Sequence, residues 1–262
     1  MKTKKIFNSV ISVGEYRSFV DKIIFYAHSK IPSYVCFANV HMVVEAYRDK
    51  SFQKLVNEAD LLLPDGKPLS VFLKLSEGIN QDRVCGMDIL PDLLRQAEES
   101  GASIYFYGST EELLRAIVQK AQTEFPKIKI AGYYSPPFRD LTREEDETIT
   151  EKIRQTHPDL VFVSLGCPKQ EKWMAAHKTK LNACLLGLGQ AFKVYAGVEK
   201  RLPLWMRNLS LEWVFRLYLE PRRLWKRYLY TNSIFLFLAV KYLVIGFFQK
   251  HRHEVPGKQS IA

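Results

Sequence analysis

Short apolar runs alternate with helical patterns along the first 195 residues, and this alternation constrains the fold more than any other feature of the sequence. The apolar runs are candidate β-strands and occupy residues 6–13, 34–38, 59–63, 103–108, 128–134, 159–166 and 183–189. Between them, apolar residues recur at helical spacing over 86–100, 110–125 and 143–156, and Thr110 is placed to cap the second of these helices. Nearly continuous apolar strands that alternate with helices are typical of a parallel sheet covered on both faces. The sequence therefore predicts an α/β fold with a mostly parallel sheet and helices on both faces.

Ligands of such sheets bind at the carboxyl ends of the strands, so the loops that follow the strands are the candidate binding loops. These loops are residues 39–41, 64–67, 108–110, 166–170 and 187–190. In one of them, Pro-Asp-Gly places Asp65 where a carboxylate can take a proton from an attacking hydroxyl, although Asp-Gly is also typical of a simple turn. Gly187 and Gly189 suit the approach of a phosphate to backbone N–H groups, but Phe192 replaces the last glycine of a dinucleotide-binding fingerprint. Gln170 begins a helix and is a candidate hydrogen-bond partner for a sugar hydroxyl, whereas a solvated helix start explains Lys169 and Glu171 equally well.

The sequence lacks the patterns typical of metal, redox and hydrolase sites. The four cysteines are widely spaced and form no C-x-x-C pair, which disfavours metal or redox use and favours a reducing compartment. The sequence has no D-x-D motif for a divalent metal and no G-x-S-x-G motif for a hydrolase nucleophile. We therefore expect neither a metal site nor a bound cofactor.

Positive charge is concentrated in the last quarter of the chain. The net charge of the whole chain is +10, and residues 200–252 hold eleven lysines and arginines against two acids. Trp205, Trp213 and Trp225 are interleaved with these bases, a combination that favours an anionic lipid surface or a phosphate group. A nucleic-acid surface is the rival interpretation, and the apolar run that follows favours lipid over it.

That apolar run covers residues 234–248, after an amphipathic helix predicted over 202–220 and a second helix that starts at Pro221. The run contains Lys241 and falls short of the about 20 apolar residues that a spanning helix needs. The sequence therefore favours monotopic association over a membrane span. It also predicts two domains, a catalytic core over 1–199 and a helical membrane-binding or acceptor-binding appendage over 200–262.

Several segments, taken in order, resemble the WecG/TagA/CpsF glycosyltransferases, glycosyltransferase family 26. The segments are FANVHMVVEAYRD, ADLLLPDGKPL, RVCGMDILPDLL, GYYSPPF, VSLGCPKQEKW and GLGQAFKVYAGVEKRLPLWMRNLSLEWVFRLYLEPRRLWKRYL, and they cover roughly residues 6–230. The resemblance implies a Rossmann-like core and an inverting transfer, without a D-x-D metal site, of a hexose or N-acetylhexosamine from a UDP-sugar. N-acetylmannosamine is the favoured sugar, and the implied acceptor is a saccharide linked to undecaprenyl diphosphate in the synthesis of a wall polymer or surface polysaccharide.

By position, the resemblance makes Asp65 the general base, with Asn39 a polar group beside it. It makes Arg83 and Gln170 ligands of the donor diphosphate or sugar, and it assigns no role to Asp88. The remaining residues of the predicted donor site are Gly187, Gly189 and Lys193. The predicted contacts of the appendage with membrane or lipid diphosphate are Arg216, Arg222, Arg223 and Arg227.

Two positions depart from the family pattern. Phe37 stands where the family often has threonine, and Lys193 stands where it usually has aspartate, so UDP-glucose or another UDP-hexose stays an alternative donor. A nucleotide-binding oxidoreductase and a non-catalytic membrane adaptor are the alternative functions. The expected location is the cytoplasmic face of the cell membrane, where the enzyme is peripheral or monotopic, with no nucleic-acid partner; the oligomeric state, including a homo-oligomer, is left open.

Overall fold

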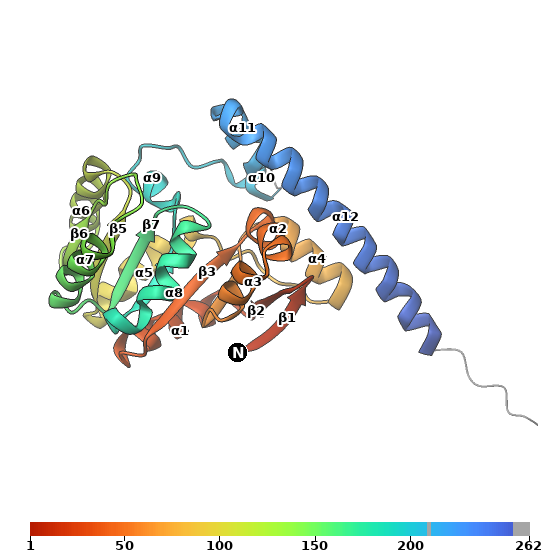
Figure 1. The fold of residues 1–262 in the computed structure, drawn as a ribbon, viewed down its shortest axis with the longest axis horizontal. Helices are drawn as coiled ribbons and strands as arrows, with labels where there is room; N and C mark the ends of the chain where they lie inside the picture. The colour runs from red at the N-terminus through yellow and green to blue at the C-terminus, as the bar shows by residue number, and fades with distance from the viewer. Residues whose placement is uncertain (209–210, 254–262) are drawn as a thin grey trace, which may run out of the picture.

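A six-stranded parallel sheet forms the centre of the molecule, in a computed structural model that describes residues 1–208 and 211–253 (Figure 1). The strands lie in the order β4-β3-β8-β7-β5-β6, and each neighbouring pair runs parallel. Their bounds are β3 (Ser33–Ala38), β4 (Leu61–Pro64), β5 (Ser103–Gly108), β6 (Lys129–Tyr134), β7 (Leu160–Ser164) and β8 (Cys184–Gly187). The predicted α/β fold is therefore confirmed, and six of the seven predicted apolar runs form this sheet.

Helices cover both faces of the sheet, so five of its strands are almost entirely buried, whereas β6 at the edge is only partly buried. One face is covered by α1 (Tyr16–His28), α5 (Gly86–Ser100), α6 (Glu111–Glu124) and α9 (Ala191–Tyr195). The other is covered by α2 (Val40–Arg48), α3 (Lys50–Asn57), α4 (Lys67–Glu77), α7 (Arg143–Gln155) and α8 (Lys169–Leu181). Successive strand residues divide between the two faces: Cys36 enters the core under α2 and α8, and Phe37 enters the core under α1 and α5.

The N-terminal segment corrects one prediction, because residues 6–13 do not form a single strand. They contribute to a hairpin of β1 (Lys2–Ile6) and β2 (Ser9–Val13), which pair antiparallel and lie outside the six-stranded sheet. Phe7 and Asn8 form the two-residue turn, and Phe7 has a φ of 54°, a region that favours glycine. The Phe7 ring is buried and packs edge-on against Phe72, with 5.2 Å between ring centroids, which stabilises the turn without a glycine.

The C-terminal region is helical but differs from the predicted helices. The predicted helix over 202–220 is divided into α10 (Leu204–Asn208) and α11 (Glu212–Leu219), and residues 209–210 between them lie outside the described residues. Pro221 starts α12 (Pro221–His253), which continues through the apolar run as one long helix. Figure 1 shows α12 passing α2 and α4 and extending beyond the core. The division into domains at residue 199 stays a prediction, since Phe235, Leu238 and Ala239 of α12 join the core formed by α2 and α4.

Candidate active site

The loops predicted to bind ligand lie together at the carboxyl edge of the sheet. Strands β4, β3, β8 and β7 are consecutive neighbours, so the loops over 64–67, 39–41, 187–190 and 166–170 follow one another along this edge. The fifth loop, 108–110, joins them because the backbone N–H of Ser109 donates to the Ser164 carbonyl at 2.9 Å. The topology therefore brings segments far apart in the sequence to one place, where ligands of parallel sheets bind.

Asp65 and Asn39 directly follow two neighbouring strands, β4 and β3, at this edge of the sheet. The backbone N–H of Asp65 donates to the Ala38 carbonyl at 2.7 Å, and both Asp65 and Asn39 are half-buried. Asn39 caps α2, because its Oδ1 accepts the Met42 N–H at 3.1 Å. Gly66 follows with a φ of 111°, which lets the chain turn sharply from β4 into α4. The structure thus brings the predicted base and the predicted polar group beside it to neighbouring positions.

Gln170 is buried and ties two of the loops together. Its Nε2 donates to the Gly187 carbonyl at 3.0 Å, and its Oε1 accepts the Gly166 N–H at 3.2 Å. A Cβ at Gly187 would lie 2.9 Å from Gln170 Nε2, so glycine is needed there for this approach. Gly189 also adjoins the amide, and its N–H donates to the Val163 carbonyl at 3.1 Å. The roles predicted for these three residues in donor binding stay predictions.

The environment of Glu171 was not indicated by the sequence. A solvated helix start is wrong for it, because its side chain is fully buried, whereas Lys169 is exposed. Its Oε1 accepts from Gln170 Nε2 at 2.8 Å, and burial raises the pKa of the Glu171 carboxyl. Cys167, on the preceding turn, also hydrogen-bonds this carboxyl. Glu171 therefore supports Gln170 from beneath the loop edge.

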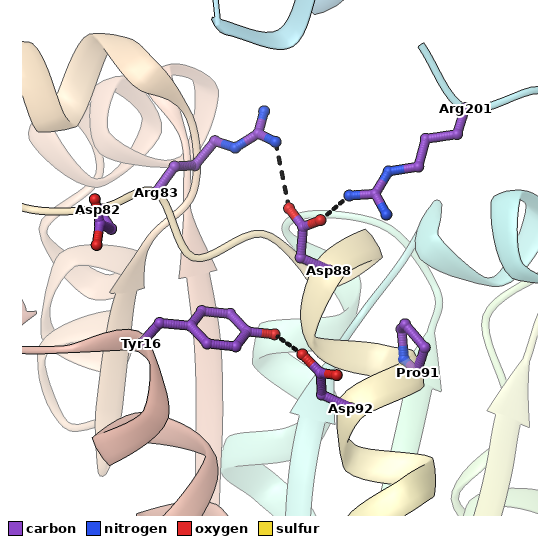
Figure 2. Close-up of a pocket in the computed structure, with 7 residues that line it drawn as sticks. All are labelled: Tyr16, Asp82, Arg83, Asp88, Pro91, Asp92 and Arg201. Carbon is purple, nitrogen blue, oxygen red and sulfur yellow. Dashed lines mark hydrogen bonds and ion pairs between the residues drawn. The ribbon is translucent and has the colours of Figure 1, made fainter. Parts of the chain in front are cut away.

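Three arginines converge on the carboxylate of Asp88, in the first turn of α5 (Figure 2). Nη2 of Arg83 lies 3.3 Å from Asp88 Oδ2, and the Cys85 thiol donates to the same oxygen at 2.9 Å. Arg201 pairs with Asp88 Oδ1, and Arg207 Nη1 lies 3.5 Å from that oxygen. The cluster reaches the loop edge, because the backbone N–H of Val84 donates to the Pro64 carbonyl at 2.9 Å.

An open cavity of about 490 Å³ adjoins this cluster. Figure 2 shows the residues that line it, which are Tyr16, Asp82, Arg83, Asp88, Pro91, Asp92 and Arg201. On its far wall, Tyr16 Oη donates to Asp92 Oδ2 at 2.6 Å, and burial together with this hydrogen bond raises the pKa of Tyr16. The cavity is thus bordered by guanidinium groups on one side and by a satisfied tyrosine–aspartate pair on the other. Arg201 and Arg207 were missed as site residues, because only the overall basic character of their segment is visible in the sequence.

The predicted arginines of the appendage divide into two pairs. Arg216 lines a small cavity together with Gln190 and Met87, and Arg227 is half-buried with an Nε that has no hydrogen-bond partner. The remaining pair, Arg222 and Arg223, is exposed at the start of α12, where Arg223 pairs with Glu220. The first pair therefore faces the core and the second faces solvent.

His41 marks the place where Arg227 approaches the core. Burial and, after it, the charge of Arg227 lower the pKa of His41 from 6.5 to about 4, so the imidazole is neutral at physiological pH. Its Nε2 lies 4.0 Å from Glu45 Oε1 on the same helix.

The two positions that depart from the family pattern have different surroundings. Phe37 is buried in the core under α1 and α5. Lys193 is on α9, and its Nζ lies 3.3 Å from Glu199 Oε1. Neither the burial of Phe37 nor the pairing of Lys193 with Glu199 identifies the donor sugar. Within residues 1–208 and 211–253, no group of three or more His, Cys, Asp or Glu side chains is arranged to hold a metal ion.

Comparisons with known proteins identify the family of this chain. Residues 4–247 match the glycosyl transferase WecG/TagA/CpsF family. A relative from Bacillus subtilis (strain 168) is 33% identical over 231 residues, covering 87% of this chain and 88% of that protein. A relative from Bacillus spizizenii is 31% identical over the same shares, and one from Staphylococcus aureus is 29% identical over 78% of each chain. All three are named N-acetylglucosaminyldiphosphoundecaprenol N-acetyl-beta-D-mannosaminyltransferase. The chain is therefore a glycosyltransferase and belongs to the WecG/TagA/CpsF family.

Proposed function

We propose that this enzyme transfers N-acetylmannosamine from its UDP-activated form to N-acetylglucosaminyl-diphosphoundecaprenol at the cytoplasmic face of the cell membrane. One observation carries the proposal: Asp65 lies at the carboxyl end of β4, on the edge that also holds Arg83 and the arginines of the C-terminal region. The names of the relatives supply the sugar and the acceptor. The family's use of UDP-sugars supplies the nucleotide.

The reaction needs a base and a site for a departing diphosphate. The acceptor hydroxyl attacks the anomeric carbon, its oxygen forms the new glycosidic bond, and the bond from that carbon to the UDP oxygen breaks. Asp65 takes the hydroxyl proton, and a single carboxylate is enough for an inverting displacement. The negative charge that develops on UDP is stabilised by guanidinium groups, which bind phosphate oxygens in pairs of hydrogen bonds. We expect Arg83, which pairs with Asp88 beside the cavity, and Arg227, whose charge acts on His41, to supply these groups.

A panel of UDP-sugars tests the donor. Purified enzyme is incubated with a short-chain lipid-diphosphate N-acetylglucosamine and with UDP-N-acetylmannosamine, UDP-N-acetylglucosamine or UDP-glucose, and the release of UDP is measured. We expect the first donor to be the best and activity to persist in EDTA. A higher kcat/KM with UDP-glucose would reject the proposed donor and would fit the departures at Phe37 and Lys193. Failure with every UDP-sugar, in a folded protein, would favour the adaptor interpretation.

We also propose that α12 lies on the membrane surface without crossing the bilayer. Residues Pro221–Gly246 are long and apolar enough to span by length and composition, but one stripe of this segment packs on the protein. Phe235 and Leu238 are buried against the core, and Phe7 packs on Phe235 with 5.4 Å between ring centroids. A spanning helix would have to leave these contacts, whereas a helix in the plane of the surface keeps them.

The opposite stripe of α12 is apolar and exposed. The exposed fractions of Leu229, Leu236 and Phe237 are 65%, 65% and 67%. The large apolar side chains exposed on the same helix also include Trp225, Val240, Val244 and Ile245. Exposed bases at the start of the helix, with tryptophans nearby, favour the headgroup region of an anionic leaflet as the surface that covers this stripe.

Vesicle binding tests this orientation. The double variant Leu236→Glu/Phe237→Glu places two charges in the exposed stripe and should bind anionic phosphatidylglycerol vesicles about 100-fold more weakly. Its UDP binding and its thermal stability in lipid-free buffer should match the wild type. Equal vesicle binding by variant and wild type would reject this stripe as the membrane contact.

A further inference from the structure

The hydrogen bonds of Gln170 fix the direction in which its side-chain amide points. Its Nε2 donates to the Gly187 carbonyl at 3.0 Å and to Glu171 Oε1 at 2.8 Å, and its Oε1 accepts the Gly166 N–H at 3.2 Å. Turning the amide over would place its oxygen against the Gly187 carbonyl and its nitrogen against the Gly166 N–H, and both contacts are repulsive. The hydrogen-bond network thus assigns one orientation, in which both N–H groups of the amide are already used.

The nitrogen and the oxygen of this amide face different surroundings. Glu171 and Gly187, which accept from the nitrogen, are buried, whereas Gly166, which donates to the oxygen, is exposed. A Cβ at Gly166 would meet no atom of a more distant described residue within 4 Å, and a Cβ at Gly189 would lie 3.4 Å from Gln170 Oε1. Both glycines have a positive φ, of 79° and 50°, and neither carries a side chain that could cover the oxygen. The amide therefore turns its oxygen toward the open loop edge and its nitrogen toward the interior.

Glu171 holds the nitrogen side of this arrangement. Its carboxyl is fully buried in the first turn of α8, where its Oε1 is an acceptor for Gln170. Among the described residues, its Oε2 has no hydrogen-bond partner, so burial of this acid costs stability that an apolar side chain of the same length would not cost. Burial also raises the pKa of the carboxyl, and a protonated carboxyl still accepts through its carbonyl oxygen. Packing alone therefore does not explain an acid at this position, whereas the need of Gln170 for a second acceptor does.

We propose that Glu171 is a positioning residue that makes Gln170 a hydrogen-bond acceptor for the sugar of the donor. Because Glu171 takes the second N–H of the amide, Oε1 is the part of the Gln170 side chain that has capacity for a ligand. The oxygens of an ionised diphosphate only accept hydrogen bonds, so they do not bind this oxygen, whereas sugar hydroxyls and the N–H of an acetamido group donate to it. The inference rests on the proposed nucleotide-sugar donor, and it assigns Gln170 to the sugar of that donor rather than to its diphosphate.

Two variants of similar side-chain length test this role in the full-length protein. Glu171→Gln keeps an acceptor oxygen for Gln170, whereas Glu171→Met removes it, and both variants remove the carboxyl group. Calorimetry measures the affinity for UDP, UDP-N-acetylmannosamine and UDP-glucose. We expect Glu171→Met to weaken the binding of UDP-N-acetylmannosamine about tenfold, the effect of one lost hydrogen bond, and to leave the binding of UDP unchanged. Glu171→Gln should restore the affinity of the wild type.

The second UDP-sugar identifies the group that donates to Gln170. An equal loss of affinity for both UDP-sugars in Glu171→Met would assign a sugar hydroxyl, and a loss confined to UDP-N-acetylmannosamine would assign the acetamido N–H. Equal weakening of UDP and of the UDP-sugars would overturn the proposal, because Gln170 would then act on the nucleotide or the variant would be generally destabilised. Unchanged affinities in Glu171→Met, or the same loss in both variants, would also overturn it.

Nuclear magnetic resonance of the wild type, with isotope-labelled glutamine, gives a measurement that does not require a variant to fold. Both side-chain N–H protons of Gln170 should exchange slowly with water, and both should stay protected when UDP-N-acetylmannosamine binds, since the ligand contacts the oxygen. Fast exchange of either proton would reject the orientation proposed for the amide. A wild type that binds neither UDP nor a UDP-sugar would reject the proposed function and the sugar contact with it, whereas protected N–H protons would still support the hold of Glu171 on Gln170. A wild type that transfers the sugar while Glu171→Met binds and transfers it equally well would reject the role of Glu171 alone.

Discussion

The α/β core and the C-terminal helix α12 use apolar side chains in different ways. In the core, Phe106 of β5 and Phe162 of β7 are fully buried, with 5.6 Å between their ring centroids. On α12, Phe235 is 8% exposed while Phe237, two residues later, is 67% exposed. The chain's own fold thus explains the apolar residues of the core, but only one stripe of those on α12. The other stripe is exposed, and we propose that a membrane surface covers it; on this proposal the contrast separates catalysis from attachment.

The charges of the two regions differ in the same way. Exposed arginines of the core, such as Arg143 and Arg154, pair with glutamates on their own helix. In the C-terminal region, Arg201 and Arg207 reach back to Asp88, and Arg222 is exposed near the apolar stripe. The C-terminal region therefore contributes cations both to the site and to the surface.

The largest effect that we expect is on catalysis, and it should leave attachment intact. Asp65→Asn removes the proton acceptor and should lower kcat by about 10²–10⁴-fold. UDP affinity, measured by calorimetry, and vesicle binding should stay within a few-fold of the wild type, because neither depends on this carboxylate. Turnover within a few-fold of the wild type would remove Asp65 from the role of base.

The two phenylalanines of α12 test whether this helix is part of the folded core. Phe235→Ala should lower the free energy of unfolding by about 3–5 kcal/mol, since it leaves a cavity between Phe7 and Phe72. Phe237→Ala should change it by no more than about 0.5 kcal/mol in lipid-free buffer. Urea denaturation followed by tryptophan fluorescence measures both. Similar losses for the two variants would show that α12 does not dock by the stripe described here.

Local patterns were enough to predict the strands of the six-stranded sheet and three of the helices that cover it, α5, α6 and α7. The predicted bounds of 86–100 match α5 because Gly101 ends the helix in a left-handed conformation with a φ of 75°. Thr110 caps α6 as predicted, accepting the Leu113 N–H at 3.4 Å. These signals lie within a few residues of the element they define, so the sequence alone reveals them.

Features that depend on distant contacts could not be predicted from local patterns. The turn at Phe7 has no glycine, and packing against α4 and α12 compensates for its positive φ. The same limit applies to the site. The place of Asp65 after a strand made it a candidate, but the family resemblance assigned its role and that of Asn39. The pairing of Asp88 with Arg201 spans 113 residues, and the burial of Glu171 depends on how α8 packs against the sheet.

His41 tests the boundary between the two regions, where Arg227 of α12 faces the core. An unfolded chain protonates His41 near pH 6.5, whereas the folded protein protonates it near pH 4, so the unfolded state binds more protons between these values. Folding stability should therefore fall as the pH drops through this window, by at most about 3 kcal/mol from this residue. In urea denaturation, His41→Gln should make folding stability less dependent on pH. Arg227→Gln should narrow the pH range over which stability changes. A wild-type stability that does not change between pH 6.5 and 4 would contradict the neutral, buried state of His41.

The smallest effect that we expect concerns the exposed bases at the start of α12. A base near an anionic leaflet contributes about 1 kcal/mol before screening, and Arg223 contributes less because it already pairs with Glu220. Arg222→Gln/Arg223→Gln should thus weaken binding to phosphatidylglycerol-containing vesicles by about tenfold at low salt, and the difference from the wild type should shrink at high salt, where the Debye length is about 3 Å. The matched control is Arg143→Gln/Arg154→Gln, which removes the same charge from α7 of the core. If both double variants lose the same affinity for vesicles, binding depends on the net charge of the protein alone. The charges of the core and of the appendage would then not differ in their effect on membrane binding. If only the α12 variant loses affinity, these two arginines act at the surface where the exposed stripe meets lipid.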